Sequence, residues 1–270
     1  MKAFLKTKEG ETKSEIELPQ QFEEKVRPDL IRRAVLSLQS RRRQPYSTDP
    51  EAGKKYSSKL SRRRRAFKGA YGIGISRVPR KTMSRSGSRF NWEGATAPNT
   101  RGGRQAHPPK VEKRWEKEIN KKERRKAIRT AMAASVIKEF VEKRGHFVQD
   151  YPIVVENDIE NINKTKDALA FFKKIGISQD LEKSLKKTEK TGKAQRRGRT
   201  KKQRKSALVV VSKKCNLMKS ASNIPGVDIV DVASLNAELL APGGDLGRLT
   251  IYTKGAIDIL EKEKLFMEAK

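Results

Sequence analysis

The apolar positions near the start of the chain predict a hairpin followed by an amphipathic helix. Residues 2–6 alternate weakly between polar and apolar, which indicates a strand, and residues 15–18 are its expected hairpin partner. A helix is predicted to begin at Pro28, because the fixed φ of proline suits a first helical turn, and to end before Pro45. Its buried stripe consists of Leu30, Ile31, Ala34, Val35 and Leu38.

Helical spacing returns after residue 119. A continuous helix is predicted from Asn120 to about Arg144, begun by a capping box of Asn120 and Glu123 and ended by Gly145 in the left-handed conformation. Apolar residues also recur at helical spacing in two shorter segments, residues 169–175 and residues 256–260.

Four short apolar runs predict the strands of a sheet. Residues 207–211, with the sequence ALVVV, are continuous and mostly β-branched, which is typical of a parallel strand covered on both faces. The other runs are residues 152–155, 227–230 and 249–252. Because these strands alternate with helices, the sequence predicts an α/β fold with a mainly parallel sheet flanked by helices.

The stretch from Arg41 to Lys110 departs from this pattern. It holds 19 Lys and Arg against 3 Asp and Glu, a net charge of +16, and only 6 Ile, Leu, Val or Phe. A segment so charged and so poor in apolar residues cannot offset its own ordering entropy. We therefore expect a long extended basic loop, residues 44–110, inserted after the first helix of a globular α/β domain that comprises residues 1–43 and 111–270.

The net charge of +31 is concentrated in two segments. Residues 182–205 carry 12 Lys and Arg against 2 Asp and Glu, so the two segments together account for +26. The remaining 176 residues hold 32 Lys and Arg against 27 Asp and Glu and are close to neutral. This concentration favours a polymeric polyanion as the partner, because phosphates on a polymer release counterions when many cations bind together.

Both basic segments are expected to contact nucleic acid. The second basic segment is expected to form a loop over residues 186–205, because its cations are interspersed with Gly and Gln. RNA is favoured over DNA, since irregular loops rich in Gly and Arg suit the crevices of a folded RNA and the sequence shows no helix-turn-helix, zinc-finger or zipper pattern. Aromatic residues that are candidates to stack on bases are Tyr46, Tyr56, Phe67, Tyr71, Phe90 and Trp92. The candidate contacts are Arg41, Arg42, Arg43, Arg62, Arg63, Arg64, Arg65, Lys68, Arg101, Arg104, His107, Lys110, Arg196, Arg197, Arg199, Lys201, Lys202 and Arg204.

The sequence predicts no catalytic residue, cofactor or metal site. The pair Gly72-x-Gly74 lacks the third glycine of a dinucleotide fingerprint, and no strand precedes it. The single cysteine, Cys215, excludes an internal disulfide and a multi-cysteine zinc site. His107 and His146 are expected at the surface or against RNA. An RNA-modifying or nucleotide-binding enzyme with an α/β core and a basic architectural DNA-binding protein stay open as alternatives to a structural RNA-binding protein.

Segments that would direct the chain to a membrane are not apparent. Its first residues lack the apolar part of a signal peptide, and no apolar run approaches about 18 residues. We therefore expect an intracellular chain with no membrane partner.

Three motifs in this chain occur in the order of a known family. They are VRPDLI at residues 26–31, RGGRQAHPPK at residues 101–110 and LAPGGDLGRLT at residues 240–250. Together with the long basic loop after the first helix, they closely resemble the universal family of large-subunit ribosomal protein number four, in its archaeal form. The resemblance extends over essentially the whole chain, which lacks the long C-terminal extension of eukaryotic members.

The resemblance implies a structural constituent of the large ribosomal subunit, in the cytoplasm, that binds large-subunit rRNA early in assembly. The globular domain would lie on the outer surface of the subunit, and the loop would help line the nascent-peptide exit tunnel, opposite the loop of ribosomal protein twenty-two. The implied partners are large-subunit rRNA, neighbouring ribosomal proteins and the nascent peptide. The tip of the loop would consist of Gly72, Gly74, Ser76, Arg77, Pro79, Arg80 and Arg85.

Overall fold

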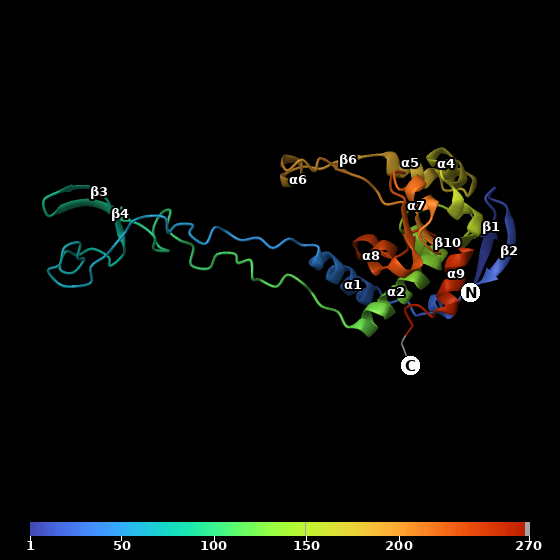
Figure 1. Cartoon of the computed structure of the whole chain (residues 1–270), viewed down its shortest axis with the longest axis horizontal. Helices are drawn as coiled ribbons and strands as arrows, with labels where there is room; N and C mark the ends of the chain where they lie inside the picture. The colour runs from blue at the N-terminus through green and yellow to red at the C-terminus, as the bar shows by residue number, and fades with distance from the viewer. Residues whose placement is uncertain (149, 268–270) are drawn as a thin grey trace. The chain divides into compact units, whose positions relative to one another are not determined.

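The chain folds into two units. The computed structural model describes residues 1–148 and 150–267 (Figure 1). One unit, here called the body, comprises Met1–Arg42 and Glu116–Lys270, and the other, here called the insertion, comprises Arg43–Trp115. The body contains the six-stranded sheet and the helices, whereas the insertion is one continuous segment of the chain.

The sheet of the body has six strands in the order β2-β1-β5-β10-β8-β9. Only β2 pairs antiparallel with its neighbour, and all the other pairs are parallel. The predicted α/β class, with a mainly parallel sheet flanked by helices, is therefore confirmed. The strands are β1 (Lys2–Lys6), β2 (Thr12–Glu17), β5 (Ile153–Val155), β8 (Leu208–Val211), β9 (Asp228–Asp231) and β10 (Thr250–Thr253).

Helices pack on both faces of this sheet. The α-helices of the body outside the second basic segment are α1 (Pro28–Arg41), α2 (Lys121–Val136), α3 (Lys138–Lys143), α4 (Thr165–Lys174), α5 (Ser178–Leu185), α7 (Asn216–Ala221), α8 (Ala237–Leu240) and α9 (Lys254–Lys262). Short 3-10 helices occur at Gln20–Phe22, Asn157–Asn161, Val232–Ser234 and Pro242–Gly244.

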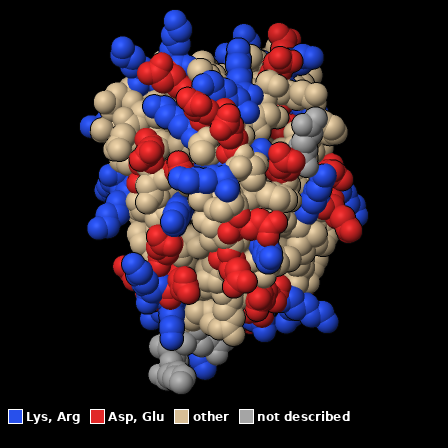
Figure 2. All heavy atoms as spheres, turned by 90° about the vertical axis from the view of Figure 1, so that its right-hand side faces the viewer, with Lys and Arg blue, Asp and Glu red and all other residues tan. Residues whose placement is uncertain are grey.

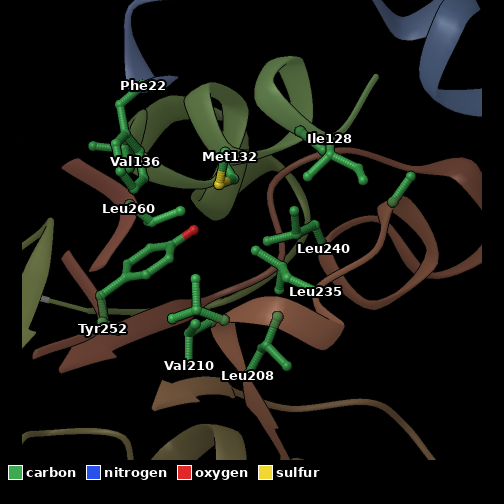
Figure 3. Packing of buried hydrophobic residues seen from close by; sticks show 14 of the residues in the cluster. Phe22, Ile128, Met132, Val136, Leu208, Val210, Leu235, Leu240, Tyr252 and Leu260 are labelled. Atoms are coloured by element: carbon green, nitrogen blue, oxygen red, sulfur yellow. The ribbon is translucent and has the colours of Figure 1, made fainter. Parts of the chain in front are cut away.

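Two hydrophobic clusters account for the continuous apolar run in β8. Leu208 and Val210 join the cluster formed by α1, α2, α8 and α9, whereas Val209 and Val211 join the cluster formed by α4, α5 and α7. This is the alternation that a strand requires when both of its faces are covered. In the first cluster the side chains of helices and sheet meet around Tyr252, whose ring packs edge-on against Phe22 with centroids 5.1 Å apart (Figure 3).

The predicted helix from Asn120 to Arg144 is in fact two helices. Ile137 adopts an extended conformation with φ −82° and ψ 114°, which separates α2 from α3. The predicted capping box is also wrong: Asn120 is the N-cap residue, but its side chain makes no capping hydrogen bond. The Glu123 side chain instead forms an ion pair with Arg33 of α1 at 3.3 Å. A tertiary contact thus replaces the local one.

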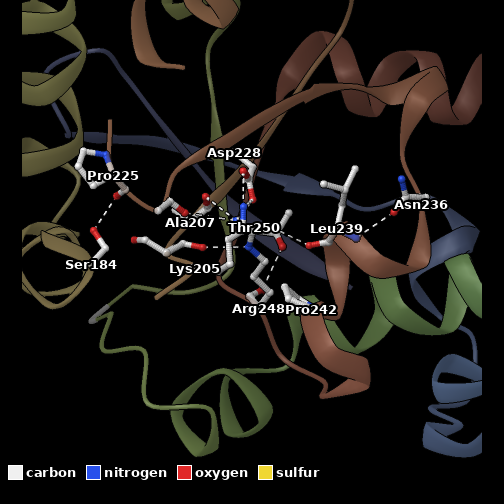
Figure 4. A network of polar contacts seen from close by, with 12 residues as sticks. Ser184, Lys205, Ala207, Pro225, Asp228, Asn236, Leu239, Pro242, Arg248 and Thr250 are labelled. Carbon is white, nitrogen blue, oxygen red and sulfur yellow. Dashed lines mark hydrogen bonds and ion pairs between the residues drawn. The ribbon is translucent and has the colours of Figure 1, made fainter. Parts of the chain in front are cut away.

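A buried arginine ties together the ends of three neighbouring strands. Arg248, 1% exposed, donates hydrogen bonds to the backbone oxygens of Ser206 and Leu239, each at 2.9 Å, and to Asp228 Oδ2 at 2.6 Å (Figure 4). Burial opposes ionisation of Asp228, yet hydrogen bonds from Lys205 and Arg248 hold the pKa of that carboxyl below its ordinary value. The network fixes the chain where it enters β8, directly after the second basic segment.

The insertion has regular structure that the sequence analysis missed. Strands β3 (Arg80–Ser86) and β4 (Arg89–Gly94) form an antiparallel hairpin around Gly87, whose φ is +55°. Two arms lead to this hairpin (Figure 1). They approach closely at one point, since a Cβ on Gly53 would lie 2.5 Å from the backbone of Gly103. Glycine is required there because no side chain fits between the arms.

Candidate nucleic-acid interface

Nearly all the predicted nucleic-acid contacts are exposed side chains. In the insertion, Arg62 to Arg65 are exposed as a run of four cations, and Lys68 is half-buried. Every other predicted contact, from Arg41 to Arg204, is exposed. Exposure is the first requirement for a residue that binds an external anion.

Ion pairs are rare among the predicted contacts. Among the residues that the structure describes, Arg42 is the one predicted contact with an ion pair, to Glu238 at 2.9 Å. Several cations elsewhere on the body are paired, as Lys2 is with Glu15 and Arg27 with Asp29. Figure 2 shows such a face, on which Lys and Arg are interspersed with Asp and Glu. Almost all of the predicted contacts therefore keep their charge free for an external partner.

The second basic segment is largely a loop, as predicted, but it contains short regular pieces. Strands β6 (Thr188–Glu189) and β7 (Lys201–Lys202) pair antiparallel, and the one-turn helix α6 (Lys193–Arg196) lies between them. Gly192 and Gly198, with φ of +69° and +74°, allow the turns on either side of α6. The result is a narrow projection whose cations are exposed on all sides.

The predicted tip residues contact one another in part. Gly72 and Gly74 have φ of +80° and +69°, and a Cβ on either would meet no atom within 4 Å. The guanidinium of Arg80 donates to Ser76 Oγ at 3.1 Å, and that of Arg85 donates to the Gly87 carbonyl at 2.9 Å. Arg77 lies over the ring of Tyr71, at 4.5 Å from its centroid, and Pro79 is half-buried. The glycines form an open turn beside a set of ordered arginines.

Aromatic side chains in the insertion stack on one another and on cations. Phe90 lies 5.0 Å from Phe67 and 5.4 Å from Trp92, measured between ring centroids. The guanidinium of Arg85 is 4.8 Å from the Phe67 centroid, and that of Arg80 is 5.3 Å from the Trp92 centroid. Phe90 and Trp92 alternate with polar residues directly after a Gly-Ser turn, and this pattern indicates the second strand of a hairpin. The hairpin was not predicted because the high charge of the segment indicated a loop.

The two histidines differ from the expectation and from each other. His107 is exposed, as predicted. His146 is 8% exposed, and its Nδ1 lies 3.0 Å from Asp180 Oδ2, so the prediction of a surface or RNA-contact role for His146 is wrong. Asp180 is also buried and belongs to α5, an element that the sequence analysis did not predict. This polar pair supports the fold of the body.

The crevice in which α/β sheets bind ligands is filled by the chain itself. That crevice lies outside the carboxyl ends of the parallel strands. Here the carboxylate of Glu160 accepts hydrogen bonds from Ser212 N at 2.9 Å, from Ser212 Oγ at 2.6 Å and from Thr253 Oγ1 at 2.8 Å. A fixed carboxylate at this place repels the phosphates of a nucleotide. No cluster of metal-ligating side chains occurs among the described residues, and none of their helices is long and apolar enough to cross a membrane.

Replacing Glu160 by alanine is expected to lower the free energy of unfolding by about 2–3 kcal/mol, because the donors of Ser212 and Thr253 lose a charged acceptor in a confined site. Urea denaturation measures the change. Glu156→Ala is the matched control, since among the described residues the Glu156 carboxylate pairs with Lys13 alone, which is exposed. Equal shifts of the two unfolding midpoints would show that Glu160 does not join the strand ends.

Known proteins that resemble the chain include archaeal members of one ribosomal family. A sequence profile described as the ribosomal protein L4/L1 family matches residues 16–263. The chain is 46% identical, over 253 residues, to the large ribosomal subunit protein uL4 of Nanoarchaeum equitans, and the match covers 93% of this chain and 94% of that protein. Proteins of the same name from Archaeoglobus fulgidus and Methanoculleus marisnigri are 44% and 46% identical, with 96% and 97% of this chain and 98% and 99% of those proteins covered.

Proposed function

The chain belongs to the ribosomal protein L4/L1 family, in its archaeal type, and from this premise we propose that it is a structural constituent of the large ribosomal subunit. It is not an enzyme. It associates with large-subunit rRNA and acts in the cytoplasm as part of the subunit.

The observation that supports rRNA binding is the concentration of exposed, unpaired cations in two segments. They lie on the insertion and on the second basic segment, while the remaining surface of the body carries many paired charges. Arg guanidinium groups bind phosphates bidentately and stack on bases, which suits a folded RNA. The chain thus binds rRNA with residues 44–110 and 186–205 and uses the rest of the body as the scaffold that holds them, which supports early assembly of the subunit.

We further propose a place for the tip of the insertion at the wall of the nascent-peptide exit tunnel. There it lies opposite ribosomal protein twenty-two and meets the nascent peptide. The exposed glycines Gly72 and Gly74 support this proposal, because a backbone without side chains can approach RNA or a passing peptide closely. Ser76, Arg77, Pro79, Arg80 and Arg85 complete the proposed tip.

The two alternatives are disfavoured on physical grounds. A nucleotide-binding enzyme would need the crevice that Glu160 fills. A DNA-binding architectural protein would read a duplex groove with a helix or a two-stranded ribbon, whereas the free cations here lie mainly in irregular segments. Neither alternative explains why the cations are divided between two separate segments.

A tip deletion tests the tunnel proposal. Ser58 Oγ and Thr96 Oγ1 lie 3.3 Å apart, so residues 59–95 can be replaced by two glycines without stretching the arms. This variant is expected to keep the cooperative urea transition of the body, and the intact chain is expected to co-sediment with the large subunit in high salt. A photoreactive residue at Arg77 of the intact chain is expected to crosslink to the nascent peptide.

The same photoreactive residue at Glu15, an exposed position on β2 of the body, serves as the control and is expected to give no nascent-peptide crosslink. Loss of the unfolding transition in the deletion variant would contradict the proposal that the body folds without the tip. Equal crosslinking from both positions, or from neither, would refute the tunnel placement. Failure of the intact chain to co-sediment would refute the ribosomal role itself.

A further inference from the structure

We propose that the base of the insertion holds a pocket for a single unpaired nucleotide of an RNA strand. The pocket is formed by Tyr46, Gln105, His107, Lys110, Lys113 and Trp115. The inference rests on the proposed rRNA binding and goes further, because it names the part of the RNA that this site takes. Arg43 and Trp115 are the two ends of the insertion, so the pocket lies where its arms begin and end.

One wall of the pocket is a stack of aromatic rings and a guanidinium. Tyr46 and Trp115 lie 5.2 Å apart between centroids, at an interplanar angle of 27°. The guanidinium of Arg43 is 3.9 Å from the Trp115 centroid. Tyr46 is 52% exposed, so its ring is only partly covered by this stack. An exposed ring held in place by a stack presents a rigid platform for a base.

The pocket has the size and the polar groups that a nucleotide needs. Its volume is about 590 Å³, within the usual range of sites for small ligands. The indole N–H of Trp115 is shielded from solvent and has no hydrogen-bond partner among the described residues. A donor that solvent cannot reach is also closed to a ligand, so the polar contacts of the pocket come from its exposed side chains. Gln105, which is exposed, adds an amide that can donate and accept.

Cations surround the aromatic wall. The ammonium group of Lys113 is 4.6 Å from the Trp115 centroid, and Lys110 also lines the pocket. Glu112 is the one carboxylate among the lining residues, so the cations outnumber it. None of these three side chains forms an ion pair within the part of the chain that the structure describes. A positive rim around an aromatic wall binds a phosphate and a base together.

These features favour an unpaired nucleotide over duplex RNA. In an A-form helix the bases are stacked and paired, and the deep groove hides their edges, so Tyr46 could not stack on a base and Gln105 could not reach a base edge. An extruded nucleotide offers a free face for stacking and a free edge for hydrogen bonds. The site therefore takes a nucleotide from a loop, a bulge or a single strand.

Two oligomers with identical phosphates but different bases test the pocket. Binding of the full chain to single-stranded oligouridylate is compared with binding to an abasic oligomer of the same length. Tyr46→Leu is expected to lower the ratio of the two affinities by about tenfold, since stacking of one base is worth about 1–3 kcal/mol and 1.4 kcal/mol is a factor of ten. Phe147→Leu is the matched control: Phe147 is 54% exposed, against 52% for Tyr46, but belongs to the body and does not line the pocket.

A second readout follows Trp115 directly. In a Trp92→Phe background Trp115 is the sole tryptophan of the chain, and oligouridylate, but not the abasic oligomer, is expected to quench its fluorescence. Equal effects of Tyr46→Leu and Phe147→Leu, or equal quenching by both oligomers, would overturn the pocket and leave the proposed rRNA binding intact. Failure of the chain to bind either oligomer at moderate salt would contradict RNA binding as a whole.

Discussion

Replacing the four arginines Arg62 to Arg65 by glutamine is expected to weaken the binding of large-subunit rRNA about a thousandfold at 0.1 M salt. All four are exposed, and none forms an ion pair among the described residues. Each phosphate that a cation neutralises contributes a slope of roughly −0.7 to −0.9 to the dependence of log K on log salt, which is a factor of about 5–8 at 0.1 M relative to 1 M. Four such contacts multiply to about a thousandfold, and the slope should become less steep by about 3.

A charge-matched variant separates local contacts from net charge. Replacing Lys2, Lys13, Arg27 and Arg33 of the body by glutamine removes the same four charges, but each of these side chains is paired with a carboxylate. This variant is expected to bind rRNA within a few-fold of the unmodified chain. Filter-binding titrations at several salt concentrations measure both constants and slopes. If both variants lost affinity equally, the chain would bind rRNA through its overall charge, without a defined interface.

The strands and first helix of the body could be predicted because their patterns reflect local burial. The run at residues 207–211 lies between two hydrophobic clusters, so every position must be apolar, and β8 occupies residues 208–211. Pro28 begins α1 as predicted, since its missing N–H has no helical partner in any case. Both the burial of a strand and the start of a helix at proline depend on residues that are close together in the sequence, so both could be predicted.

Features that depend on distant contacts could not be predicted in the same way. The apolar stripe continues through Ile137, so the sequence alone gave no sign of the break between α2 and α3. His146 is buried only because Asp180, from another helix, provides its partner. The pairing of Arg42 with Glu238 likewise joins α1 to α8. In each case, the deciding partner lies far away in the sequence.

The candidate interface was easier to predict than its internal order. The uneven distribution of charge along the sequence identifies the segments in which most cations are exposed. Such cations stay at the surface because like charges without carboxylate neighbours cannot be buried. The stack of Tyr46 on Trp115 was not predicted, because these two residues lie near opposite ends of the insertion and are far apart in the sequence. Charge alone therefore gives the location of an interface, whereas its pockets depend on how the arms meet.

Replacing Arg248 by methionine is expected to lower the free energy of unfolding by about 3–5 kcal/mol. The guanidinium is 1% exposed and hydrogen-bonds four backbone oxygens, those of Ser206, Leu239, Ala207 and Gly226, in addition to the Asp228 carboxylate. Methionine fills much of the space but removes the donors of the Ser206 and Leu239 oxygens and one of the two cations that pair with Asp228, and breaking a buried pair on one side costs about that much. Urea denaturation monitored by far-UV circular dichroism measures the change.

Two further variants decide whether the arginine fork is the cause. Arg248→Lys keeps the charge but supplies a single ammonium for five acceptors spread over β8, β9, α8 and the loops before them, so it is expected to recover less than half of the loss. Arg33→Met removes an arginine whose side chain is 62% exposed and pairs with Glu123 at the surface, and it is expected to change stability by less than about 1 kcal/mol. If lysine restored full stability, charge pairing with Asp228 alone would explain the role of Arg248, and its hydrogen bonds to the backbone would contribute little.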